Sequence, residues 1–222
     1  MVRSTTTAEQ SQADQQSVEG QQPVVTPVGA EGCRPMRADA RRNREAVLTA
    51  AASAFAENGV ESPLEDIARQ AGVGIGTLYR HFPTREELVF GVYQREVAQL
   101  CESATALVDE LPPAEALQEW MRRFVLYAAT KRGLVGMLRT MMADRTDLFA
   151  ETRVRIRDAA NLLLTSAAAA GEIRDDITAE DLTRSIGGIC MASDGPVWSP
   201  ANAGRLVDLV FDGLRFGAPN KR

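Results

Sequence analysis

The sequence predicts an all-α protein in which a small helix-turn-helix three-helix domain is followed by a larger helical domain. Helix-start signals recur along the chain, and the apolar residues between them recur at spacings of three and four. Of the 222 residues, 45% are hydrophobic and only 5% are aromatic, and alanine is abundant, which favours helices over sheets. We expect a disordered tail over 1–37, the helix-turn-helix domain over 38–84, the larger domain over 85–217 and a short tail over 218–222.

The stretch from Gly72 to Leu88 contains the most specific of these signals. A glycine turn at 71–74 leads into the run 75–82, which is shorter than the roughly 12–15 residues that an isolated helix needs. Before the turn, Ser62 and Pro63 have the residue types of a helix cap and of a first helical position. Helix, turn and short helix in this order predict a helix-turn-helix.

The remaining helices are predicted from their caps and terminators. We expect them over residues 40–58, 84–108, 114–131, 134–142, 146–170, 178–193 and 199–216. Thr84 and Thr178 have the residue pattern that begins a capping box. Gly171 should end the helix over 146–170, and Arg132-Gly133 should separate the helices over 114–131 and 134–142.

Composition argues against several classes of protein. Three cysteines, far apart and odd in number, predict neither a disulfide framework nor a zinc site and fit a reducing cytoplasm. The sequence has no apolar run of membrane-spanning length and no secretory pattern, so we expect a cytoplasmic protein without a membrane contact. His81 is the only histidine, and no nucleophile signature, metal-ligand spacing or phosphate loop is present. We therefore expect no enzyme and no cofactor.

Charge is distributed unevenly along the chain, whose net charge is −5. Residues 1–33 carry one arginine against four acids, whereas residues 34–85 carry eight arginines against six acids. The positive part coincides with the helix-turn-helix, as expected of a surface that meets DNA. An ordinary fluctuation in surface composition is the alternative.

Residues 72–82, GVGIGTLYRHF, and 84–88, TREEL, resemble the signature of the TetR family of transcriptional regulators. Ile67-Ala68 and Ala71-Gly72-Val73 stand in register before it, so the likeness covers roughly residues 41–88. Gly74 stands where the family usually has serine or another small polar residue, and Ser62-Pro63 where a threonine pair is common. These departures concern individual DNA contacts and not the fold.

The motif and the resemblance together predict a DNA-contacting set of residues. Ile75, Gly76 and Thr77, at the start of the short helix, should lie near base edges, whereas Tyr79 and His81 should contact phosphates. The full set is Arg41, Arg42, Ser62, Gly74, Ile75, Gly76, Thr77, Tyr79, Arg80, His81 and Arg85. For the arginines near position 42, a solvated cluster that aids solubility is the alternative.

The resemblance implies that the second domain binds an effector and forms a dimer. An apolar cluster predicts ligand contacts at Phe124, Tyr127, Met137, Thr140, Met141 and Asn161, with Arg123 as a further polar candidate. A methionine cluster that merely fills the core is the alternative. Dimer contacts are predicted at Leu182, Ile186, Ile189, Leu206, Leu209 and Gly213, with packing inside the monomer as the alternative.

These features predict a homodimeric transcriptional regulator, a repressor that a small apolar ligand releases from a palindromic operator in double-stranded DNA. One alternative is a dimeric DNA-binding protein whose C-terminal domain senses no ligand. Another is a helical enzyme or carrier in which the motif is fortuitous. A gel shift with double-stranded DNA separates this last class from the others, and a ligand-dependent melting temperature separates the first two.

Overall fold

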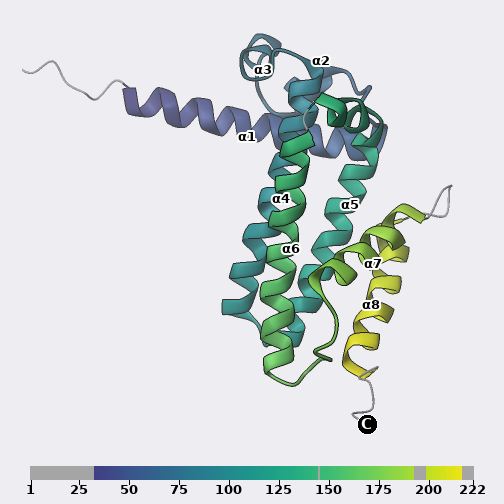
Figure 1. The fold of residues 1–222 in the computed structure, drawn as a ribbon. Coiled ribbons are helices and arrows are strands. Elements are labelled where there is room, and N and C mark those ends of the chain that lie inside the picture. Colours follow the sequence, from purple (N-terminus) through teal and green to yellow (C-terminus); the bar gives the residue numbers. More distant parts are fainter. Residues whose placement is uncertain (1–32, 145, 193–198, 217–222) are drawn as a thin grey trace, which may run out of the picture.

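The computed structural model describes residues 33–144, 146–192 and 199–216, which form helices and, within these ranges, no strand (Figure 1). The helices are α1 (Cys33–Asn58), α2 (Leu64–Gln70), α3 (Ile75–His81), α4 (Arg85–Glu110), α5 (Pro113–Asp144), α6 (Thr146–Ala169), α7 (Ala179–Ala192) and α8 (Pro200–Phe216). The all-α fold is therefore confirmed. Most of the predicted N-terminal tail and the predicted tail 218–222 lie outside the described residues.

The first three helices pack around a shared apolar centre. Phe55 of α1, Ile67 of α2 and Leu78 of α3 are all fully buried, and Phe82, which follows α3, is nearly so. The short α3 is thus held by its neighbours, as its length requires. In Figure 1, α2 and α3 lie beside α1, which crosses one end of the molecule and projects beyond it.

The helix α1 begins earlier than the sequence predicted. It starts at Cys33 and not at Ala40, so the expected tail of residues 1–37 overlaps its first turns. Pro35 is compatible with this start because the backbone N–H that a proline lacks has no intrahelical partner in the first turn.

A bundle of α4, α5 and α6 extends away from α1, and α7 and α8 pack on α5 (Figure 1). One apolar core runs through all of these helices, from Val47 in α1 to Leu214 in α8. Within the described part of the chain, no helix combines the length and the apolar run needed to cross a membrane.

The helix α5 corrects a prediction, because it runs unbroken through Arg132 and Gly133. A Cβ atom placed on Gly133 would come within 2.7 Å of the carbonyl oxygen of Phe55 in α1. Glycine at this position lets two helix backbones approach closely and does not end the helix.

Ser62 corrects a second prediction, because it does not cap α2. Pro63 is the N-cap residue and makes no side-chain capping bond. The Ser62 hydroxyl instead donates to the carbonyl oxygens of Ala54, at 3.0 Å, and Gly59, at 2.9 Å. The Ser62 hydroxyl thus ties the loop before α2 to the C-terminal end of α1.

Candidate functional site

The helix α3 presents an exposed face made of residues that the sequence singled out. Ile75 is 36% exposed and Tyr79 is 45% exposed, although both are large and partly or wholly apolar. Gly74, Gly76 and Arg80 are also exposed, while Thr77 and His81 are half-buried beside them. The structure thus brings these seven predicted residues together on one short helix and its N-cap.

The turn before α3 uses its two glycines differently. Gly72 has φ +69°, a conformation that favours glycine, whereas Gly74 has φ −72° and is the N-cap of α3. No side chain caps α3, in keeping with a glycine where a serine is common. A Cβ on Gly74 or Gly76 would meet no atom within 4 Å, so packing inside the monomer does not require glycine there.

Arg85 holds this region together from the start of α4. Its Nη1 donates to the carbonyl oxygens of Val60, at 2.5 Å, and Ser62, at 2.7 Å. Arg85, which the sequence predicts to contact a phosphate, therefore also positions the loop before α2. Thr84 is the N-cap of α4 as the predicted capping box requires, since the backbone N–H of Glu87 donates to the Thr84 hydroxyl oxygen at 3.2 Å.

The arginines of α1 flank the same region. Arg41 is exposed, Arg42 pairs with Asp39 on the surface, and the Arg44 guanidinium lies 5.0 Å from the centre of the Phe82 ring. Ser62 is only 4% exposed and its hydroxyl is engaged within the chain. Its predicted contact with DNA is therefore wrong, because the side chain points into the protein.

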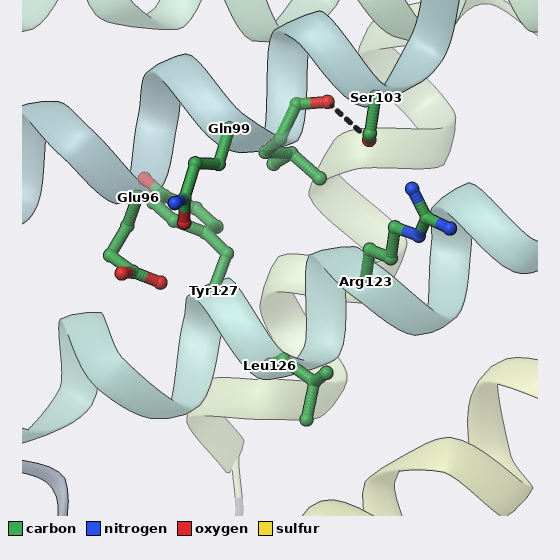
Figure 2. A pocket seen from close by; sticks show the side chains of 7 residues that line it. Glu96, Gln99, Ser103, Arg123, Leu126 and Tyr127 are labelled. Carbon is green, nitrogen blue, oxygen red and sulfur yellow. Dashed lines mark hydrogen bonds between the residues drawn. The ribbon is translucent and has the colours of Figure 1, made fainter. Parts of the chain in front are cut away.

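A cavity of about 230 Å³ lies between α4 and α5 (Figure 2). Its lining comprises Glu96, Gln99, Leu100, Ser103, Arg123, Leu126 and Tyr127. Two of the predicted ligand residues, Arg123 and Tyr127, thus line a cavity. No cluster of acidic, histidine or cysteine side chains able to hold a metal occurs in the described ranges.

The other predicted ligand residues do not line this cavity. Phe124 is buried behind it, and its ring lies 5.5 Å from that of Tyr127. Thr140 is exposed, with its hydroxyl donating to the carbonyl oxygen of Gly136 at 3.4 Å, and Asn161 is exposed on α6. Met137 and Met141 are half-buried farther along α5.

The polar residues on the α4 wall of the cavity were missed by sequence reasoning. Glu96, Gln99 and Ser103 stand at i, i+3 and i+7 and so share one face of α4. That pattern was the available signal. Burial raises the pKa of the Glu96 carboxyl; smaller effects come from Arg95, which lowers it, and Glu45, which raises it.

Only some of the residues that were predicted to form the dimer interface are exposed, and those lie on α8. Leu182 and Ile186 of α7 are buried in the monomer's own core and are not available to a partner. Ile189 is half-buried, whereas Gly213 is exposed. Leu206, Leu209 and Phe216 are 46%, 67% and 77% exposed, and together with Gly213 they form what we call the α8 face.

The α1–α3 arrangement, with α3 exposed in front of a helical bundle, is that of the helix-turn-helix regulators. Residues 47–92 match the family described as bacterial regulatory proteins, tetR family. Residues 112–216 match the C-terminal domain of SbtR-like transcriptional regulators. The chain belongs to the TetR family of transcriptional regulators, which are DNA-binding proteins and not enzymes.

Solved structures extend the likeness over most of the chain. The TetR transcriptional regulator SCO0520 from Streptomyces coelicolor is 49% identical, with a TM-score of 0.70, over 78% of this chain and 98% of that one. A TetR regulatory protein from Mycobacterium vanbaalenii is 35% identical, with a TM-score of 0.64, over 82% and 99% of the two chains.

Curated relatives match a shorter region. HTH-type transcriptional regulators of Staphylococcus aureus are 43% identical over 63 residues, which are 28% of this chain and 34% of theirs. The match therefore spans about a third of the length of these relatives.

Proposed function

We propose that the chain is a homodimeric repressor that binds a palindromic operator in double-stranded DNA and leaves it when a small molecule binds. The observation that carries this proposal is the exposed face of α3. Ile75 and Tyr79 face outward from a helix that is anchored by the buried Leu78 and Phe82. A recognition helix needs this combination, because it must enter the major groove without losing its place on the protein.

Each group on the α3 face has a role in this proposal. Ile75 and Thr77 meet base edges, where an apolar side chain can contact a thymine methyl group. Tyr79, Arg80 and His81 contact phosphates, as do Arg41 and Arg42 at the flank. Gly74 and Gly76, which the monomer's packing does not require to be glycine, allow the DNA backbone to approach closely.

We propose that α4 transmits the effect of ligand binding to the recognition helix. Three residues separate the end of α3 from the start of this helix, which then forms one wall of the cavity. A ligand that favours a different tilt of α4 would change the spacing of the two recognition helices in the dimer. A coupling of about 1–3 kcal/mol, or roughly 5–150-fold in affinity, is typical of such regulation.

Selection of bound sequences from a random pool of double-stranded DNA tests the proposal. We expect an enriched palindrome whose half-sites lie about 34 Å, or a multiple of a helical turn, apart. A pool with no enriched sequence would contradict sequence-specific binding. An enriched sequence without symmetry would contradict binding as a dimer.

Replacing Tyr79 by phenylalanine is expected to weaken binding to all sequences about equally. The change removes a neutral hydroxyl that donates to a phosphate and keeps the ring, so the affinity should fall while the salt dependence of log K, which counts the phosphates neutralised by Lys and Arg, stays nearly the same. Gel shifts over a salt series measure it. Thr165→Val, which likewise removes one exposed hydroxyl but lies near the C-terminal end of α6, is the control. A changed base preference would show that Tyr79 reads bases.

The mutual effect of ligand and operator on each other's binding tests whether a ligand releases the protein from DNA. If a ligand weakens operator binding, the operator must weaken ligand binding by the same factor. Calorimetry of a ligand found by screening, with and without operator DNA, measures this factor. Equal ligand affinities in the two titrations would favour a dimer whose C-terminal domain does not regulate.

A further inference from the structure

We propose that the cavity between α4 and α5 binds a small organic cation with an apolar body, held at its charged end by Glu96. The inference rests on the proposed function, since it names the class of effector that the cavity accepts. Figure 2 shows Glu96 and Arg123 at opposite ends of the cavity, with Tyr127 between them.

The two charged residues of the lining differ in how well they are neutralised. Arg123 Nε donates to Glu119 Oε1 at 3.0 Å, so its charge is matched by an acid on its own helix. Glu96 instead shares one guanidinium with a second carboxylate. Arg95 Nη1 donates to Glu96 Oε1 at 3.3 Å, while Arg95 Nε pairs with Glu45 of α1.

The group of Glu45, Arg95 and Glu96 therefore carries one negative charge more than its cation balances. The Glu96 side chain is 19% exposed, so water compensates its charge poorly. This burial raises the pKa of Glu96, which means that the charged carboxylate is less stable there than in water. A ligand cation beside Glu96 would offset that loss.

The rest of the lining fits the body of such a ligand. Leu100 and Leu126 offer apolar surface, as does the aromatic ring of Tyr127, whose centre already lies 5.9 Å from the Lys131 ammonium. Gln99 and Ser103 add polar groups that can fix an orientation. A cavity of about 230 Å³ has room for a phenyl ring with a short alkylammonium chain.

Three probes of nearly equal size test the charge preference: 4-phenylbutylammonium, the neutral 4-phenylbutanol and 4-phenylbutyrate. Calorimetry on the full chain at pH 7 is expected to give the ammonium roughly tenfold tighter binding than the alcohol, as for a charged hydrogen bond, and the weakest binding for butyrate. Butyrate binding best, or no binding by any probe, would overturn the proposal.

The variant Glu96→Gln should reduce the affinity for the ammonium to that for the alcohol. Glu102→Gln is the matched control, because Glu102 is an exposed acid on the same helix that does not line the cavity. It should keep the preference for the ammonium. Retention of this preference by Glu96→Gln would show that another group recognises the charge.

A second pair of variants tests the same site from its exposed rim. Leu126 is 59% exposed, so its replacement leaves the core intact. Leu126→Glu should strengthen ammonium binding several-fold, and Leu126→Lys should weaken it by a similar factor. Equal affinities in the two variants would place the cation elsewhere.

A gel shift with the selected operator, without any probe, separates the two proposals. Operator binding by a protein with no preference for the ammonium would overturn the cation site alone. A preference for the ammonium in a protein that binds no operator would overturn the proposed function.

Discussion

Replacing Leu209 by glutamate is expected to convert the proposed dimer into a monomer. Leu209 is the most exposed leucine of the α8 face, so the substitution leaves the monomer's core untouched. In a dimer the new carboxylate would be buried against apolar side chains without a partner, which is strongly unfavourable. Sedimentation of the purified variant measures the change in mass.

The loss of the dimer should also remove most of the operator affinity. Joining two half-site contacts commonly raises affinity by about 10²–10⁴-fold, and a monomer loses this gain. Leu162→Glu is the control, because Leu162 is an exposed leucine on α6, away from the α8 face, and that variant should stay dimeric. An unchanged dimer after Leu209→Glu would move the interface to another surface.

Replacing Gly133 by alanine is expected to destabilise the fold by about 1–3 kcal/mol, the range for an overpacked core. The added methyl group would lie 2.7 Å from the Phe55 carbonyl oxygen, and a backbone atom cannot swing aside as a flexible side chain can. The two helices must therefore move apart. Unfolding in urea, followed by circular dichroism, measures the change in the free energy of unfolding.

The matched control lies one turn farther along α5. A Cβ on Gly136 would meet no atom within 4 Å, and Gly136 is exposed. Gly136→Ala should therefore stabilise the protein by about 0.5–1 kcal/mol, because alanine favours the helical backbone. Destabilisation by both variants to the same degree would show that the α1–α5 crossing is not the cause.

Local signals were predicted well because their chemistry lies within a few residues. The capping box at Thr178 is formed as expected: the Asp181 N–H donates to the Thr178 hydroxyl oxygen at 3.1 Å, and the Thr178 N–H donates to Asp181 Oδ2 at the same distance. Gly171, which was predicted to end a helix, follows the end of α6 at Ala169 and has a positive φ of +72°. The exposed face of α3 followed from a motif of seventeen residues.

Long-range packing was predicted poorly, because spacing alone does not say what an apolar residue will meet. Leu182 and Ile186 have the same helical spacing as an interface seam, yet they face the monomer's own core. Gly133 was predicted to end a helix, because the residue it packs against, Phe55, is far away in the sequence. The cavity needs α4 and α5 side by side, so its lining could not be read from either helix.

The continuous core has a consequence for how the molecule unfolds. Gly91 of α4 packs against Leu48 of α1 and Phe82, since a Cβ on it would lie 3.1 and 2.9 Å from their side chains. Gly133 of α5 packs on α1 in the same way. A fragment of the chain that ended before α4 would lack these contacts. Amide protons in α1 and α4 should therefore exchange with solvent in one cooperative event, as a single unfolding unit.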